Sequence, residues 1–344
     1  MISKKIYVVC PDRNKPLGGV KQLYRLVDVL NAMGHEAYIL HKKKNFRVTW
    51  YKNETPIASF AGVFKKLNWY RKSPLMRFIE GIFFGKKMPE PGSIIVFPEV
   101  YGPHLNVFSE YPIIIFNQNC YYSFEQFPHF EPAISPYNNT NLLGCLVVSE
   151  DSKKYLSLYQ PLIKVERVRI GLSDVFNYGK DKQKKIAFMP RKLAEDANQI
   201  YQFIADKPYF KDWEFVAIDG LNEQEVADVL KQCALFLSFN HREGFGLPPA
   251  EAMACGCYVI GYAGNAGNEY FKPEFSIRIE DRNILNFVAA LQETIITYNH
   301  TPEEIIAKGE MASKYILSVY NKSNEKADIE SSWNNITNGI KGTN

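Results

Sequence analysis

The sequence predicts an α/β fold made of two parallel-sheet domains. Short apolar runs alternate with amphipathic segments of helix length along the chain, as they do in βαβ units. The alternation is interrupted by a polar, charged run at 178–185 (YGKDKQKK) and then starts again. A length of 344 residues suits two domains of ordinary size, each able to bury a core.

The first domain is expected to occupy residues 1–178. Its clearest helix, 20–33, carries apolar residues on one face at helical spacing and ends at Gly34. Strands are expected at 5–10, 37–40, 93–97, 113–116 and 145–148.

The second domain is expected at 179–322, and the last segment, 323–344, is expected to carry a C-terminal helix. Strands are expected at 186–189, 214–218, 234–238 and 257–262, and helices at 194–204, 223–233 and 325–340. The second domain looks short, with a single strand, 214–218, expected between the helix at 194–204 and the helix at 223–233.

Composition excludes several classes of protein. Hydrophobic and charged residues make up 46% and 23% of the chain, as in globular proteins, and no run approaches a membrane span. The start, MISKKIYVVCPD, predicts a first strand and not a signal peptide. The six cysteines show neither a CxxC pair nor the spacing of a zinc site. We therefore expect a cytoplasmic protein.

Charge is divided unevenly along the chain. Residues 1–180 carry a net charge of +10 and residues 181–344 a net charge of −6, which together give the formal net charge of +4. The basic half is expected to favour an anionic acceptor or surface.

The most informative segment is 239–270 (FNHREGFGLPPAEAMACGCYVIGYAGNAGNEY). It places Glu243 and Glu251 eight positions apart around a Gly-Phe-Gly-Leu-Pro-Pro turn, and the flanking apolar runs predict strand, loop, helix and strand. Bare N–H groups at such a helix start bind anions such as phosphate. Carboxylates beside the phosphate can accept hydrogen bonds from sugar hydroxyls. An ordinary α/β turn with two solvated carboxylates is the alternative interpretation.

At these residues the chain resembles the retaining nucleotide-sugar glycosyltransferases of the GT-B fold, the glycosyl transferases group 1, which include sucrose synthase and bacterial glycogen synthases. The Glu-x7-Glu spacing is the signature of that family. The resemblance implies two Rossmann-like domains that face a cleft and a C-terminal helix that crosses back to the first domain. It also implies that Glu251 holds the ribose. The donor sugar is then held by Glu243 and the amides of Gly244, Phe245, Gly246 and Leu247.

A second glycine loop precedes the helix at 20–33. Gly18 and Gly19 allow the backbone to approach a ligand closely and leave the helix start open. They do not form a GxGxxG fingerprint, so dinucleotide binding is not favoured. The resemblance implies that this loop faces the donor phosphate, and a plain tight turn is the alternative.

Two cations, Arg191 and Lys192, follow the first strand of the second domain, at the end where α/β sheets bind ligands. Both suit a leaving diphosphate. The family usually places a lysine about five residues after its arginine. Here Asp196 has that spacing and Lys192 is the substitute, or else an exposed residue at the start of a helix.

Polar residues also follow two strands of the first domain. Many family members have a histidine after the strand at 113–116, but this chain has Gln118 and Asn119. Either could bond a sugar hydroxyl, or the loop only caps the strand. Glu99 follows another strand and is a candidate base or hydroxyl ligand for the acceptor, with a solvated side chain as the alternative.

The segment from Lys65 to Lys87 (KKLNWYRKSPLMRFIEGIFFGKK) mixes basic and aromatic residues. This pattern fits peripheral contact with an anionic membrane, as for an enzyme acting on a lipid-linked acceptor at the inner face of a membrane. The same pattern fits a surface that binds nucleic acid or a polysaccharide equally well. A partly buried loop and helix with solvated lysines is the plainer interpretation. Nucleic acid is the less expected partner.

The resemblance implies transfer of a hexosyl or related sugar from a nucleotide-sugar donor to a glycan or lipid-linked acceptor, with retention of configuration. No protein nucleophile is assigned, because in the resembled family the leaving phosphate oxygen is thought to accept the acceptor proton. The chain has no Asp-x-Asp triplet, so neither a metal nor another cofactor is expected. The alternatives are a non-catalytic nucleotide-sugar or glycan-binding protein, a nucleotide-sugar epimerase and a phosphorylase.

Overall fold

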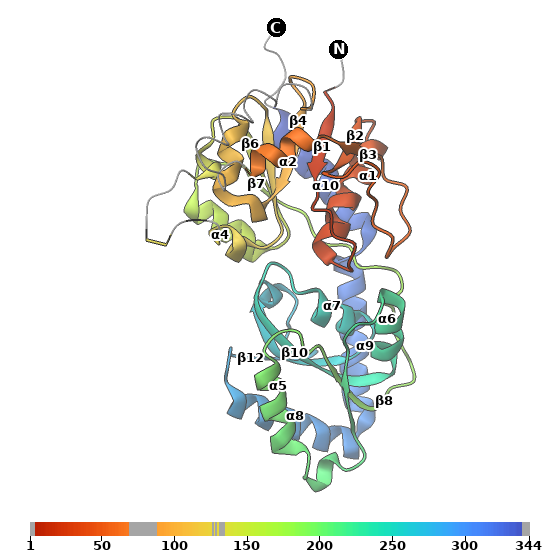
Figure 1. Cartoon of the computed structure of the whole chain (residues 1–344). Coiled ribbons are helices and arrows are strands. Elements are labelled where there is room, and N and C mark those ends of the chain that lie inside the picture. Colours follow the sequence, from red (N-terminus) through yellow and green to blue (C-terminus); the bar gives the residue numbers. More distant parts are fainter. Residues whose placement is uncertain (1–3, 69–87, 126, 128, 131–134, 339–344) are drawn as a thin grey trace. The chain divides into compact units, whose positions relative to one another are not determined.

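The computed structural model describes residues 4–68, 88–125, 127, 129–130 and 135–338. The chain forms two compact units. Unit 1 is Met1–Val168 with Lys326–Asn344, and unit 2 is Arg169–Glu325. Each unit is built on one sheet whose described strand pairs are all parallel (Figure 1). None of the helices in the described part of the chain is long and apolar enough to cross a bilayer.

Unit 1 contains a seven-stranded sheet in the order β3-β2-β1-β4-β5-β6-β7. Its central strands β1, β4 and β5 are rich in Ile and Val and buried at every position, as strands covered on both faces are. The elements of this unit are β1 (Ile6–Val9), α1 (Gly18–Ala32), β2 (Ala37–His41), β3 (Ile57–Ser59), α2 (Ala61–Leu67), β4 (Ile94–Pro98), η3 (Glu99–Phe108), β5 (Ile113–Asn117), η4 (Cys120–Tyr122), η5 (Pro136–Asn138), β6 (Leu142–Val147), α4 (Glu150–Tyr159), β7 (Val165–Arg167) and most of α10 (Lys322–Thr337).

Helix α1 begins earlier than the sequence pattern suggests. Gly18 and Gly19 are its first two residues and not part of the preceding turn, because helical hydrogen bonds already run back to Leu17. Leu17 provides no side-chain cap. Gly34 follows the helix with a φ of +87°, a left-handed conformation that suits the glycine expected to end it.

Unit 2 contains a five-stranded sheet in the order β12-β11-β10-β8-β9. The chain runs outward from β8 to β9 and then returns to the other side of β8 as β10. The elements of this unit are β8 (Gln183–Phe188), α5 (Ala194–Ile204), η6 (Pro208–Phe210), β9 (Glu214–Ala217), α6 (Glu223–Gln232), β10 (Cys233–Glu243), α7 (Leu247–Ala254), β11 (Tyr258–Asn265), η7 (Ala266–Glu269), β12 (Ser276–Ile279), α8 (Ile284–His300) and α9 (Pro302–Val319).

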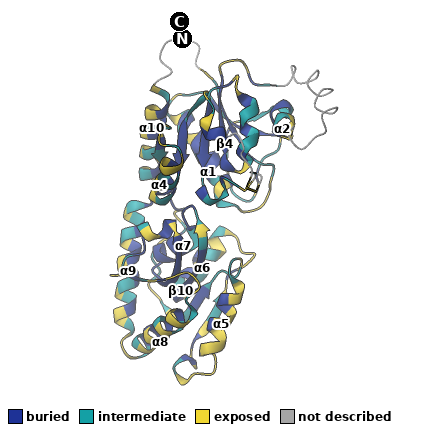
Figure 2. Cartoon of the chain, turned by 90° about the vertical axis from the view of Figure 1, so that its left-hand side faces the viewer, coloured by how far each residue is buried: buried dark blue, intermediate teal, exposed yellow. Residues whose placement is uncertain are grey.

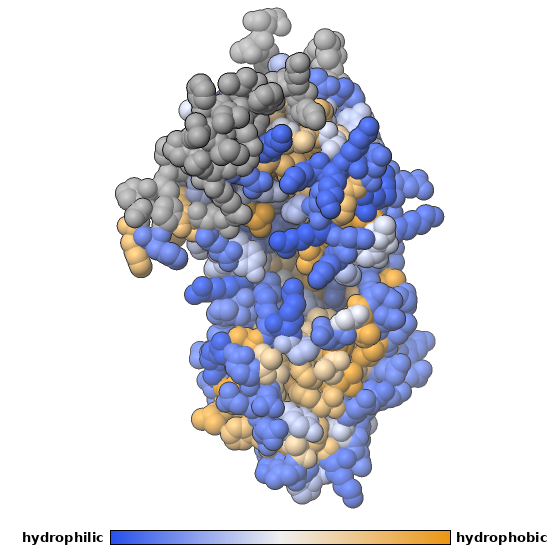
Figure 3. Space-filling model, in the orientation of Figure 1, coloured by the Kyte–Doolittle hydropathy of each residue, from blue (hydrophilic) through white to orange (hydrophobic). Residues whose placement is uncertain are grey.

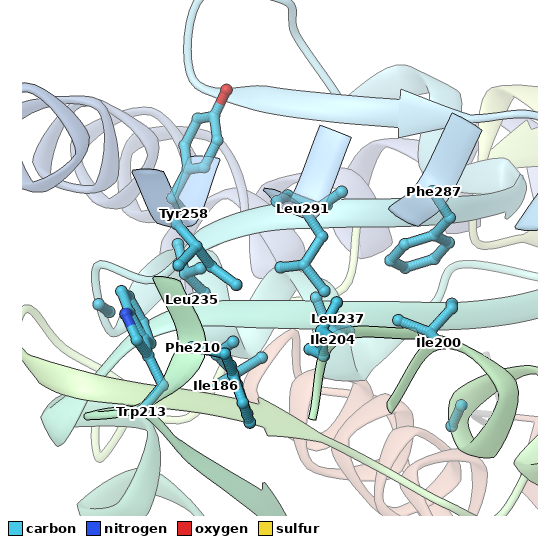
Figure 4. Close-up of a cluster of buried hydrophobic side chains, with 14 of the residues drawn as sticks. Ile186, Ile200, Ile204, Phe210, Trp213, Leu235, Leu237, Tyr258, Phe287 and Leu291 are labelled. Carbon is cyan, nitrogen blue, oxygen red and sulfur yellow. The ribbon is translucent and has the colours of Figure 1, made fainter. Parts of the chain in front are cut away.

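The core of unit 2 lies between its sheet and helices α5 and α8. Ile186 on β8, Leu237 on β10, and Phe287 and Leu291 on α8 belong to one cluster of buried side chains, and none of the four is exposed (Figure 4). Helices α6, α7 and α9 contact the sheet as well. Figure 2 shows the strands of both units as buried and the outward sides of the helices as exposed.

β9 is an edge strand of the sheet of unit 2. In the fully described residues 169–325, it is the single strand between α5 and β10, the strand that ends at Glu243. The rings of Phe188 and Phe215 lie 4.5 Å apart, and Tyr201 lies 5.2 Å from Phe215. These side chains line a groove of about 340 Å³; Phe188 and Phe215 are partly buried, and Tyr201 is exposed. Figure 3 shows hydrophobic side chains gathered on the visible face of unit 2. The short second domain therefore leaves part of its apolar interior at the surface.

The change from unit 1 to unit 2 falls at Val168, before the boundary expected at 178. The residues that precede β8 are bound to unit 2 by their backbone and side chains. The Leu172 amide donates to the Tyr320 carbonyl at 2.9 Å, and Lys182 Nζ donates to the Cys255 carbonyl at 2.8 Å. The polar run at 178–185 thus belongs to unit 2, and its last three residues begin β8.

The end of the chain belongs to unit 1, as expected for this fold class. The residues of α10 from Lys326 onward group with that unit. Trp333 is 1% exposed and its ring lies 6.0 Å from that of His35. Lys164 Nζ donates to the Asn335 carbonyl at 3.0 Å. Helix α10 therefore completes the core of unit 1.

Replacement of Trp333 tests this role. Trp333→Ala is expected to lower the free energy of unfolding of unit 1 by about 3–5 kcal/mol, because a fully buried indole is lost and a cavity is left. Denaturation in urea, followed by hydrogen exchange with mass spectrometry, measures the loss and locates it. Asn334→Ala changes the exposed neighbour on the same helix and is the control. Equal stabilities of the two variants would contradict the assignment.

Candidate functional site

The two neighbouring strands β8 and β10 define the candidate site in unit 2. The chain order reverses between them, and ligands of open α/β sheets bind at the carboxyl ends of strands at such a reversal. A cavity of about 180 Å³ lies there. Its lining includes Arg191 and Lys192 after β8, Asn240 and Glu243 at the end of β10, and Asp219, Gly220 and Leu221 after β9.

Lys192 and Glu243, which both line the cavity, form an ion pair. Lys192 Nζ lies 2.5 Å from Glu243 Oε1, although the two residues are 51 positions apart in the sequence. Their side chains are 28% and 18% exposed, so the pair is partly shielded from water. Leu193 follows with a φ of +50°, a conformation that is unusual for leucine. The structure thus brings together Lys192 and Glu243, which the sequence analysis predicted as site residues on separate grounds.

Arg191 is the cation that remains available to a ligand. It is exposed, lines the cavity, and pairs with no carboxylate in the described part of the chain. Asp196, at the spacing where the resembled family has a lysine, is buried instead. It accepts hydrogen bonds from the Tyr262 hydroxyl at 3.0 Å and from Arg282 Nη1 at 2.7 Å. Asp196 thus supports the start of α5 and takes no part in the cavity.

An irregularity at the end of β10 sets the direction of Glu243. The register with β11 shifts between Asn240 and Glu243, and Arg242 in between has a φ of +48°. Asn265, opposite Glu243, has a φ of +67°. Such bulges re-aim side chains, and strained backbone of this kind clusters at functional sites.

The glycine loop after Glu243 is held by aromatic residues. The Tyr270 hydroxyl donates toward the Gly246 carbonyl at 2.7 Å, with the Phe245 carbonyl at 3.1 Å. The Phe245 ring packs 5.3 Å from Tyr270 and 5.0 Å from Tyr320 and is buried. Only the backbone of Phe245 can therefore serve a ligand.

The amides of this loop are candidate anion donors, although Gly244 and Gly246 are buried and outside the cavity lining. In the described residues, the N–H groups of Gly244 and Gly246 donate to no acceptor. Pro248 and Pro249 fill the first turn of α7 and have no N–H, so that turn provides fewer donors than helix starts usually do. Leu247, partly buried, is the first residue of α7. Glu251 lies one turn further along α7, partly buried and outside the cavity lining.

In unit 1 hydrogen bonds connect three of the predicted site residues, Glu99, Gln118 and Gly19. Glu99 Oε2 accepts a hydrogen bond from the Gln118 amide at 3.1 Å, and Gln118 Nε2 donates to the Gly19 carbonyl at 3.1 Å. A Cβ on Gly19 would come within 2.9 Å of Gln118 Oε1. The ends of β4 and β5 and the start of α1 are thereby linked. Gly18, beside them, is partly buried.

Two side chains in this cluster have structural partners. Asn119 is 6% exposed, and its Oδ1 accepts from the Tyr121 amide at 3.1 Å, so it caps η4. Glu99 is 5% exposed and is not the solvated side chain considered above. Burial raises the pKa of Glu99 to about 7, against the lowering effect of the backbone amides that donate to it. Gln118 is the more accessible polar residue of the loop.

Sequence reasoning missed the cavity residues Asp219, Gly220, Leu221 and Asn240. All of them follow or end a strand, and that position was the available signal.

Most of the basic, aromatic segment that begins at Lys65 (69–87) lies outside the described residues. Within the described residues, no three His, Cys, Asp or Glu side chains gather as a metal site requires.

Comparison with known proteins identifies the fold. Residues 215–322 match the model of the family Glycosyl transferases group 1. Sucrose-phosphate synthase from Thermosynechococcus elongatus superposes with a TM-score of 0.66 at 12% identity, covering 98% of this chain and 100% of that one. The Anabaena protein HepE in complex with UDP-glucose gives 0.60 at 13% identity, covering 96% and 99%. The chain therefore has the GT-B fold, and residues 215–322 resemble a group 1 glycosyltransferase domain.

A sequence relative is similar to part of this chain. An alpha-1,6-glucosyltransferase of Actinobacillus pleuropneumoniae serotype 7 is 27% identical over 209 residues. The match covers 58% of this chain and 59% of that relative's length. The matched group 1 domain includes the cavity residues from Ile218 to Pro248, while Arg191 and Lys192 precede it.

The buried carboxyl of Glu99 predicts a pH dependence. Its pKa is about 7 when folded and near 4.5 when unfolded, so the folded state binds more protons between these values. The free energy of unfolding therefore falls as the pH rises through that interval, by about 3 kcal/mol in total. Glu99→Gln is expected to abolish this slope, as measured by denaturation at about pH 5 and about pH 8.

Glu54→Gln replaces an exposed carboxyl of the same unit and serves as the control for this measurement. It should keep the wild-type slope. A Glu99→Gln protein with the wild-type pH dependence would show that Glu99 titrates normally.

Proposed function

We propose that this protein is a glycosyltransferase that moves a hexosyl or related sugar from a nucleotide-sugar donor to an acceptor hydroxyl with retention of configuration. The observation that carries the proposal is the cavity at the reversal between β8 and β10. Its lining combines Arg191, which pairs with no carboxylate in the described residues, with the ion pair of Lys192 and Glu243, and the glycine loop joins two lining residues, Glu243 and Pro248. Such an arrangement suits a diphosphate joined to a neutral sugar.

The cavity is smaller than the roughly 300 Å³ at which ligand pockets begin, so it takes only part of the donor. The loop after β9, with Asp219 and Gly220, offers mainly backbone groups and is proposed to hold the base. The cations after β8 and the Gly244–Gly246 amides are proposed to hold the diphosphate. Glu251 on α7 is proposed to hold the ribose.

Glu243 and Lys192 are proposed to bind the transferred sugar and the leaving phosphate together. A carboxylate accepts hydrogen bonds from sugar hydroxyls, and the adjacent ammonium stabilises the charge that develops as the bond to phosphate breaks. In the proposed step the bond from the anomeric carbon to the phosphate oxygen breaks and a bond to the acceptor oxygen forms on the same face. The acceptor proton passes to the departing diphosphate, so no protein nucleophile is needed.

Arg191 and the open amides supply positive charge from the protein itself, so we propose that no metal is required. The acceptor is proposed to be a glycan or a lipid-linked glycan bound through the basic first unit. Gly18, Gly19 and Gln118 are proposed to contribute there. Contact of the segment 65–87 with an anionic membrane remains a prediction. UDP-glucose is the first donor to test, because it occupies one GT-B protein of this shape and a sequence relative is a glucosyltransferase.

Loss of Arg191 tests the diphosphate site. Arg191→Ala is expected to weaken binding of the preferred nucleoside diphosphate about 10- to 100-fold, because a charge-assisted hydrogen bond is lost. Calorimetric titration with UDP, GDP and ADP in the presence of EDTA measures it. Lys211→Ala removes an exposed cation of the same unit as the control. If no nucleotide binds to the wild type, the proposed function is wrong.

Loss of the Glu243 charge tests the chemistry. Glu243→Gln keeps the shape of the side chain and is expected to lower kcat/KM for sugar transfer at least about 100-fold, with a smaller effect on nucleotide affinity. Product analysis with UDP-glucose and glycan acceptors measures the rate, and Glu274→Gln is an exposed control. A wild-type protein that binds nucleotide but transfers or epimerises no sugar would instead be a binding protein.

A further inference from the structure

Asn240 is an unexplained polar side chain in the wall of the cavity. It lies on β10, three positions before Glu243, and is 6% exposed. Its Nδ2 is buried and has no hydrogen-bond partner among the described residues. Buried amides almost always have partners, so an orphaned one requires a reason.

Two glycines, Gly246 and Gly264, leave room for the Asn240 side chain. A Cβ on Gly246 would come within 2.3 Å of Asn240 Nδ2, and a Cβ on Gly264 within 2.9 Å of Asn240 Cβ. Both glycines have positive φ, +87° and +63°. The fold therefore leaves space on two sides for an amide that makes no internal hydrogen bond.

The surroundings of Asn240 favour an anionic oxygen as its partner. The same cavity is lined by Arg191 and Lys192, two cations that follow β8. Glu243 is already engaged by Lys192. The terminal torsion of asparagine is soft, so the amide can turn its NH2 group from Gly246 toward the cavity.

We propose that Asn240 binds the donor, by donating a hydrogen bond from Nδ2 to an oxygen of the diphosphate. This inference rests on the proposed function, since it assigns one more contact to the same site. Binding of the ligand would satisfy a group that is unsatisfied in the free protein. The residue would then add to affinity without adding to the stability of the fold.

Affinity and stability are measured together in the experiment. Asn240→Ala is expected to weaken UDP binding about 10- to 100-fold in calorimetry, the loss typical of a hydrogen bond to a charged group, and to leave uridine binding measured by NMR unchanged. Asn240→Leu conserves the volume of the side chain. It is expected to have a melting temperature at or above that of the wild type, because the orphaned amide is removed.

Asn299→Ala is the matched control. Both ends of the Asn299 amide are bonded, to the Tyr209 carbonyl at 2.8 Å and to Trp213 Nε1 at 3.1 Å. This variant is expected to melt at a lower temperature and to bind UDP like the wild type.

Each alternative outcome is distinguishable. Wild-type UDP affinity in Asn240→Ala, or an equal loss for UDP and uridine, would overturn the diphosphate contact while leaving the proposed function intact. A lower melting temperature in Asn240→Leu with unchanged UDP affinity would assign Asn240 a structural role. If the wild type binds neither UDP nor another nucleoside diphosphate, the proposed function fails and this inference fails with it.

Discussion

The candidate site depends on the parallel pairing of β10 with its two neighbours. Leu235 on β10 lies opposite Ile186 on β8 and Tyr258 on β11, and all three are buried. Burial of both faces of the sheet fixes this register, since a slip of one residue would move every apolar side chain to the wrong face. The carboxyl ends of the strands therefore meet at one edge, where Lys192 reaches Glu243.

The loops at that edge are held in conformations that the chain would not adopt alone. Leu193, Arg242 and Asn265 all have positive φ, a region that costs free energy for residues other than glycine. Packing around them compensates for this cost. The Tyr270 hydroxyl fixes the loop at Gly246, and the buried Phe245 ring anchors it from the other side. The loop amides are thus preorganised for an anion.

The charges of the site are arranged for a ligand that is only partly anionic. Lys192 and Glu243 neutralise each other, so the place where they meet carries little net charge. Arg191 nearby has no carboxylate partner in the described part of the chain. In the proposed function, Arg191 attracts the diphosphate and the neutral sugar exchanges hydrogen bonds with the pair. A uniformly basic site would favour phosphate without regard to the sugar attached to it.

In the first unit, too, a few hydrogen bonds connect residues from distant parts of the chain. Glu99, Gln118 and Gly19 come from three different elements and are connected by two hydrogen bonds of 3.1 Å. Because Glu99 is buried, its protonation state is linked to the stability of the loop it supports.

The sequence alone determined the alternation of strands and helices, the two parallel sheets, and the motif that begins at Glu243. These features rest on local periodicity and on turn residues, which act over a few positions. Strands of three residues, β3 and β7, escaped prediction because they are too short to show a period. Only the tertiary structure decided the change of unit at Val168, the burial of Glu99 and the orphaned amide of Asn240. Those properties depend on which distant segments pack together, and that is set by strand order and register across the whole sheet.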